Sequence, residues 1–225
     1  MKPITRYRGP LSLEQVAEGM NAAGRNAKRL CEDAQLLYDS GRYATALALA
    51  VLSIEESGKL SLLRGVACAT TEERLKEAWK EYRDHRAKNV AWIMGELVAQ
   101  GAKTLKGLAP IYDKDSDHPA LLDVAKQLGL YTDCYGAGHW SEPTAAIDQE
   151  FAAHIVRIAS VLVPKHETTI REVELWVEHV GKHWGTPQML GGSVEFERAM
   201  QREGLKQYEI GEIEKFFGLT PDKPH

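Results

Sequence analysis

The sequence predicts an all-α fold, a bundle of long antiparallel helices followed by a short helical C-terminal extension. Apolar residues recur at three- and four-residue spacing over long stretches, which is the period of an amphipathic helix. Strand signals are scarce, because no sustained apolar–polar alternation occurs and no turn dipeptide joins two apolar runs. The 225 residues are enough for one sizeable helical core.

Three long helices are predicted in the first half of the chain. The first covers residues 12–38, with Ser12 as its N-cap. The second covers residues 42–69 and the third residues 70–100, with acidic residues at the start of the third. Gly101 is a natural helix stop for the third.

The second half of the chain is expected to be less regular. Residues 102–117 are rich in Gly, Pro and Asp, and residues 131–143 form an aromatic, glycine-rich segment that reads as an irregular loop. Shorter helices are expected over residues 118–130, 144–163, 168–184 and 193–203. Pro164 separates the last two from the rest, so we place a helical-bundle domain at 1–165 and a helical extension at 166–225, packed on the bundle or on a partner.

Composition and charge restrict the compartment and the partners. The formal net charge is −4, so no overall basic field attracts nucleic acid or an anionic membrane, although a local cleft can still be basic. The three cysteines are odd in number and far apart, which favours free thiols over disulfides or a zinc site. Residues 1–10 lack the apolar segment of a secretory signal, and the longest uncharged run, 43–54, is too short to cross a bilayer. We therefore expect a cytoplasmic protein that does not associate with membranes.

A polar cluster interrupts the second predicted helix. Residues 44–54 contain no charge, so this segment is expected to be buried at the centre of the bundle. Glu55, Glu56 and Lys59 then follow on the same apolar stripes. Charges in such a position are costly to bury unless they are paired or used.

The third predicted helix carries a matching set of polar residues. His85 and Asn89 lie on its core-directed stripe, and the basic residues on the same turns are Arg83, Arg86 and Lys88. If the second and third helices are antiparallel around Thr70, residues equally far from that turn should meet. Glu55 and His85 each lie 15 residues from Thr70, so the two polar sets are expected at one level of the bundle. The alternative is structural, since a Glu–Lys pair at helical spacing often only stabilises a helix.

These motifs resemble the AbiV family of bacterial abortive-infection proteins. The resemblance extends over residues 13–162 and rests mainly on 41–59 (GRYATALALAVLSIEESGK) and 83–88 (RDHRAK), with LYTD at 130–133 and WSEP at 140–143 in support. It implies a HEPN-like helical bundle that defends against phage by halting the infected cell, as a toxin directed at its own host. It also implies a homodimer, a link to translation arrest, engagement by a phage protein and, as in many HEPN proteins, RNA cleavage without a metal.

One feature of HEPN nucleases is missing. Their signature places an arginine four to six residues ahead of a histidine, and no histidine of this chain has an arginine in that window. RNA cleavage nevertheless needs a base, an acid and cations for the phosphate charge. We expect His85 to be the acid or base, Lys59, Arg86 and Lys88 to stabilise phosphate, and Glu55 or Glu56 to orient them. Arg83 and Asn89 are expected to bind beside them.

Two other functions remain open. In the first, the polar cluster only specifies the bundle, and an exposed surface engages translation machinery or a phage protein. The candidate contacts are the aromatic residues Tyr131, Tyr135, His139 and Trp140, which could instead cap the end of the bundle. In the second, carboxylates bridge two metal ions, but that site needs two Glu-x-x-His motifs, and Tyr82 stands at the required position before His85. We therefore expect no metal and no cofactor.

Overall fold

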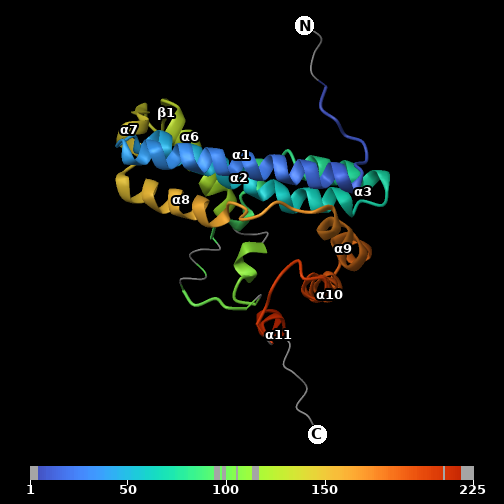
Figure 1. Ribbon diagram of the computed structural model, residues 1–225. Helices are drawn as coiled ribbons and strands as arrows, with labels where there is room; N and C mark the ends of the chain where they lie inside the picture. The colour runs from blue at the N-terminus through green and yellow to red at the C-terminus, as the bar shows by residue number, and fades with distance from the viewer. Residues whose placement is uncertain are drawn as a thin grey trace. The chain divides into compact units, whose positions relative to one another are not determined.

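The computed structural model describes residues 5–93, 97, 100–104, 106–112, 117–209 and 211–218 (Figure 1). Helices dominate these residues, and a single two-stranded sheet accompanies them. The all-α prediction is confirmed. Within the described part of the chain, no helix combines the length and the apolar character needed to cross a membrane.

Contacts along the chain define two compact units. Unit 1 contains Met1–Asn21, Ser61–Asp84 and Thr168–His225, and unit 2 contains Ala22–Leu60 and His85–Glu167. Helices α1 (Leu13–Asp39) and α2 (Tyr43–Ala67) are each divided between the units. The start of α1 and the end of α2 belong to unit 1, and the remainder of both helices belongs to unit 2. The domain boundary predicted at residue 165 stays a prediction.

The ends of α1 follow from its sequence. The hydroxyl of Ser12 accepts a hydrogen bond from the backbone of Gln15, whose side chain accepts one from the backbone of Ser12, so two free N–H groups of the first turn are satisfied. After the helix, Gly41 adopts a φ of 74°, a left-handed conformation that costs glycine little. The N-cap prediction for Ser12 and the stop before α2 are both confirmed.

Helix α2 is the central helix of unit 2. Its uncharged segment is almost fully enclosed, with Leu47 and Val51 at 0% exposure and Ile54 at 1%. The core around it also takes side chains from α1, α6 (His118–Leu130) and α8 (Gln149–Leu162). The burial predicted from the absence of charge is therefore confirmed.

The predicted third helix is broken. Helix α3 (Glu72–Glu81) begins at its N-cap Thr71, but it ends before a turn that leads to the short helices α4 (His85–Lys88) and η1 (Val90–Ile93). The physical reason is at the end of α3, where the guanidinium of Arg83 donates to the carbonyl of Trp79. The backbone amides of Arg83 and Asp84 then bond to carbonyls three residues back, as in a 3₁₀ turn, so the α-helix ends. The prediction of one continuous helix holds for residues 72–81 and is wrong for 82–93. Most of 94–100 lies outside the described residues.

The predicted loop at 131–143 is partly ordered as a hairpin. Strands β1 (Asp133–Tyr135) and β2 (His139–Ser141) pair antiparallel, with Cys134 opposite Trp140. The connecting turn contains Gly136 and Gly138, both with positive φ. The short helix α7 (Pro143–Ala146) follows the hairpin, and another short helix, η2 (Ala109–Tyr112), precedes α6.

The C-terminal segment belongs to unit 1 and is helical as predicted. Helix α9 (Ile170–Val180) starts at a capping box between Thr169 and Glu172, and η3 (Gly181–His183) continues it. Helix α10 (Met189–Arg202) starts four residues earlier than expected, and α11 (Glu212–Phe217) was not predicted. Helices α9 and α10 pack together through Leu175, Val180, Phe196, Ala199 and Met200.

Candidate functional site

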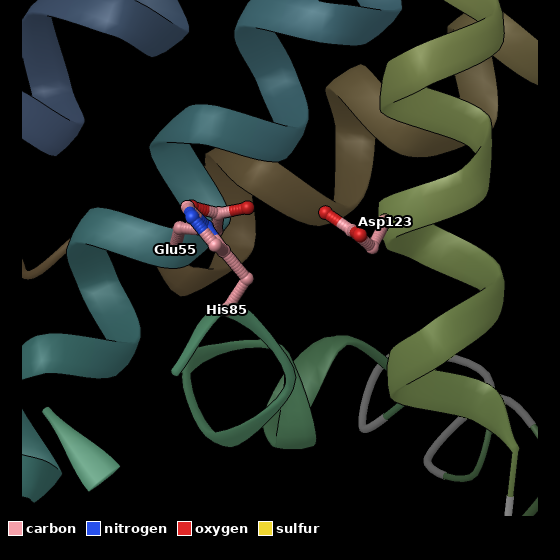
Figure 2. A group of neighbouring side chains, drawn as sticks. All are labelled: Glu55, His85 and Asp123. Atoms are coloured by element: carbon pink, nitrogen blue, oxygen red, sulfur yellow. The ribbon is translucent and has the colours of Figure 1, made fainter. Parts of the chain in front are cut away.

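The polar cluster of unit 2 is centred on the carboxylate of Glu55. This side chain comes from the buried part of α2 and is 4% exposed. Its Oε2 lies 2.7 Å from Nδ1 of His85 on α4, and its Oε1 accepts a hydrogen bond of 2.5 Å from Nζ of Lys126 on α6. Figure 2 shows the ring of His85 next to Glu55, with the carboxylate of Asp123 directed toward them from α6. The predicted meeting of Glu55 and His85 is confirmed.

The hydrogen bond to Glu55 determines which ring nitrogen of His85 is available. An ionised carboxylate only accepts, so Nδ1 must carry the proton and donate it to Oε2. Nε2 then carries the lone pair of the neutral ring, and no residue that the structure describes hydrogen-bonds to it. The side chain of His85 is 57% exposed, so this nitrogen belongs to a solvent-reachable group. A buried carboxylate behind an exposed imidazole is an arrangement suited to general acid–base chemistry.

Lys126 and Asp123 belong to the cluster but were not predicted. The side chain of Lys126 is 6% exposed, and its Nζ lies 2.8 Å from Oδ1 of Asp123 as well as close to Glu55. Burial by itself would lower the pKa of Lys126, but the ion pair with Asp123 and the hydrogen bond to Glu55 outweigh it and raise the pKa. One signal was present in the sequence, because Lys126 follows Leu122 and precedes Gly129 on the buried face of its helix.

Two glycines bring the neighbouring helices close to α2. A methyl group on Gly58 would collide with the backbone carbonyl of Lys88 on α4, and one on Gly129 of α6 would lie 2.8 Å from the carbonyl of Ala44. Side chains at these positions would hold the helices apart. The small residues thus let α4 and α6 deliver His85 and Lys126 to the same carboxylate.

Lys88 is a buried cation on the same short helix as His85. It is 8% exposed, and its ammonium group forms no hydrogen bond or ion pair with any residue in the described part of the chain. Burial lowers its pKa, while the charge of Glu55 opposes that shift and the charge of Lys59 adds to it. Lys88 therefore carries a positive charge that the protein compensates only in part.

The remaining predicted catalytic residues lie around this cluster. Glu56 and Lys59 form their own ion pair, 2.5 Å between Oε1 and Nζ, and both are about four-fifths buried. Arg86 is exposed on α4. The charges of Lys59 and Glu56 act on Lys88, so this ion pair lies near its ammonium group.

The residues predicted to bind are not brought together. Arg83 lies in unit 1, where its guanidinium donates to the carbonyls of Trp79 and Tyr7. Asn89 is fully buried, and neither side-chain amide atom has a hydrogen-bond partner among the described residues. The aromatic residues of the hairpin region are exposed to solvent and do not cover a core, namely Tyr131, Tyr135, His139 and Trp140.

The groups of Glu55, His85 and Asp123 could also approach a metal ion, since their potential ligand atoms lie within 4.8 Å of one another. However, the ammonium group of Lys126 contacts both carboxylates and already supplies a positive charge at that point. A second cation would be repelled there. We assign no metal ligand to this cluster.

Comparison with known proteins gives one result. The family model described as AbiV, of the HEPN type, matches residues 15–164, which include the whole Glu55–His85 cluster. No curated protein and no solved structure matches the chain.

Proposed function

The chain belongs to the AbiV family of HEPN proteins, and from this premise we propose that it halts growth or translation in phage-infected cells by cleaving RNA. Family membership connects it with abortive infection, a defence against phage. The observation that carries the ribonuclease proposal is the exposed imidazole of His85, held at Nδ1 by the buried Glu55. The proposed location is the cytoplasm, where infected cells hold their RNA and ribosomes.

The proposed reaction uses Nε2 of His85 as the base. It takes the proton of a ribose 2′-hydroxyl, the 2′-oxygen forms a bond to the adjacent phosphorus, and the bond from phosphorus to the 5′-oxygen breaks. The leaving 5′-oxygen takes a proton from water. Glu55 stabilises the imidazolium that forms and keeps the ring in the required tautomer, as carboxylates do in other histidine-based sites. The products are a 2′,3′-cyclic phosphate and a 5′-hydroxyl.

The cations around His85 suit a phosphate group. Lys88 is buried without a hydrogen-bonded anion among the described residues, so an anionic ligand would offset part of its desolvation cost. Arg86 is exposed on the same helix and can add a planar, bidentate donor. Lys88 and Arg86 come after His85 in the chain, whereas HEPN nucleases have an arginine ahead of the histidine. We propose that these two cations bind the phosphate in its place.

The proposal is tested by expressing His85→Asn in cells and measuring growth and total RNA. Asparagine removes the base but keeps a polar side chain, so growth arrest and RNA cleavage should both be lost while thermal unfolding stays cooperative. His154→Asn is the matched control, because His154 is another exposed histidine of unit 2. Growth arrest by the folded His85→Asn variant would contradict the proposal.

A second candidate function rests on the hairpin. Trp140 is 73% exposed, Tyr131 60% and Tyr135 46%, and exposed aromatic side chains are frequent anchors in protein interfaces. In this alternative the protein does not cleave RNA and instead binds translation machinery or a phage protein through these residues. Co-purification with ribosomes that is lost in Trp140→Ala but kept in His85→Asn would favour it.

We also propose that the protein is a homodimer. Leu121 and Val124 lie one turn apart on α6 and are 61% and 54% exposed, which is unusual for neighbouring apolar side chains of a monomer. A second copy that buries this face would remove the exposed area. Light scattering should give a dimer for the wild type and a monomer for the double variant Leu121→Lys, Val124→Lys.

A further inference from the structure

The cluster contains a continuous chain of polar contacts from three helices. Oδ1 of Asp123 lies 2.8 Å from Nζ of Lys126, Nζ lies 2.5 Å from Oε1 of Glu55, and Oε2 of Glu55 lies 2.7 Å from Nδ1 of His85. Exposure rises toward both ends, because Lys126 and Glu55 are enclosed while Asp123 and His85 reach solvent. The two oxygens of Glu55 thus serve two different partners.

We infer that Lys126 is a positioning residue, which keeps the carboxylate of Glu55 aimed at His85 and limits how strongly that carboxylate stabilises the charged ring. This inference rests on the proposed role of His85 as a base. A base has to be unprotonated when it acts, and a carboxylate in contact with an imidazole stabilises the charged ring. The ammonium of Lys126 shares the charge of that carboxylate and is itself a nearby positive charge, so it acts in the opposite sense.

Lys126 also supports the geometry of Glu55. A buried carboxylate with an unused oxygen loses the solvation of that oxygen, which costs free energy and favours protonation of the group. The hydrogen bond from Lys126 satisfies Oε1 and leaves Oε2 to His85. Asp123 in turn holds the ammonium group from its other side. Lys126 is not expected to touch RNA, because Glu55 and Asp123 already engage its ammonium group.

Other charged groups lie on the elements around His85 and do not replace Lys126. From α2 these are the paired Glu56 and Lys59, whose charges largely cancel. From α4 itself they are Arg86 and Lys88, and from α6 Asp123 stands beside Lys126. The neighbouring η1 carries only apolar residues and tryptophan. Lys126 is the cation that the structure shows in direct contact with the partner of His85.

The experiment is an NMR titration of the His85 ring in the full-length protein, with its signal identified by its loss in His85→Asn. Lys126→Met keeps the length of the side chain and removes the charge, so the titration midpoint of the His85 ring should move to higher pH. Lys126→Arg restores a cation and should return the value close to that of the wild type. Lys28→Met removes a surface lysine of the same unit and should leave it unchanged.

Lys126→Gln keeps the test decisive if Lys126→Met does not fold. Its amide can still donate to Glu55 but carries no charge, so the titration midpoint of His85 should again move to higher pH. An unchanged titration in every folded variant that lacks the charge at position 126 would overturn the inference. The titration needs no RNA. If the wild type does not cleave RNA but the shifts have the stated signs, the proposed function fails while the role of Lys126 stands.

Discussion

Glu55 and His85 are 30 residues apart in the sequence, yet Oε2 of the first lies 2.7 Å from Nδ1 of the second. The contact joins the central helix α2 to the first residue of the short helix α4. It leaves the exposed histidine with one committed nitrogen and one available nitrogen, and the proposed chemistry depends on this division.

Exchanging the carboxylate of Glu55 for an amide should disable the site. In Glu55→Gln the amide is a poorer acceptor for Lys126 and cannot stabilise the imidazolium, so RNA cleavage should fall by about 10²–10⁴-fold. The loss of a buried partner for Lys126 should also lower the free energy of unfolding by about 3 kcal/mol. The measurements are cleavage of a labelled RNA and urea unfolding. Glu32→Gln, at an exposed ion pair of α1, should change neither, and full activity in Glu55→Gln would refute the assigned role.

Gly58→Ala should displace the helix that carries His85. The new methyl group would collide with the carbonyl of Lys88, so we expect a net loss of about 1–3 kcal/mol in unfolding free energy together with reduced cleavage. Gly191→Ala is the matched control, because Gly191 also lies within a helix and nothing stands within 4 Å of its added carbon. That variant should gain about 0.5–1 kcal/mol from helix propensity. Equal behaviour of the two variants in thermal melts would count against close packing at Gly58.

Lys88 should lower the free energy of unfolding while it improves the binding of RNA. Burial lowers its pKa, so at neutral pH the folded protein bears the cost of a charge that the unfolded chain solvates freely. The cost is fully present below the folded pKa and is relieved as the pH rises through it. Lys88→Met should therefore raise the free energy of unfolding by about 1 kcal/mol at pH 7 while it raises the KM for RNA. A destabilised Lys88→Met variant, measured by urea unfolding, would show that the ammonium is well paired instead.

Cys68 should make the protein sensitive to alkaline pH. Burial raises the pKa of its thiol to about 11, although the neighbouring Trp176 side chain and the charge of Arg64 act against the rise. The unfolded thiol therefore ionises first, and stability is retained below about pH 9 and falls by about 2–3 kcal/mol toward pH 11. Cys68→Ala should flatten this part of a plot of unfolding free energy against pH. Cys134→Ala, at an exposed thiol, should leave the slope as it is, and a slope unaffected by Cys68→Ala would contradict the prediction.

Part of the site could be predicted from sequence because its signals are local. The uncharged segment before Glu55 indicated a buried helix, and equal distances from the turn near Thr70 placed His85 opposite Glu55. The break after α3 could not be seen, since no glycine or proline marks it and the Arg83 side chain ends the helix. The predicted contact of Glu55 and His85 is still correct, because both residues lie at the same level of the bundle whether or not α3 continues to His85.

Lys126 was not predicted as a partner of Glu55, because 71 residues of sequence separate the two and its place on the buried face of α6 does not name the partner. Its place depends on how closely α6 packs on α2 at Gly129, which is a property of packed surfaces and not of a local pattern. The hairpin was missed for a related reason. Its strands are three residues long and exposed, so they lack the apolar alternation by which strands are recognised.

The most direct test of the account is cleavage of a defined RNA by the purified protein in the presence of EDTA, followed by identification of the new ends. The account predicts 2′,3′-cyclic phosphate and 5′-hydroxyl ends from the wild type and from His154→Asn, and intact RNA with His85→Asn. Cleavage that persists in His85→Asn, or RNA that stays intact with the wild type while it arrests growth, would contradict a histidine-based ribonuclease.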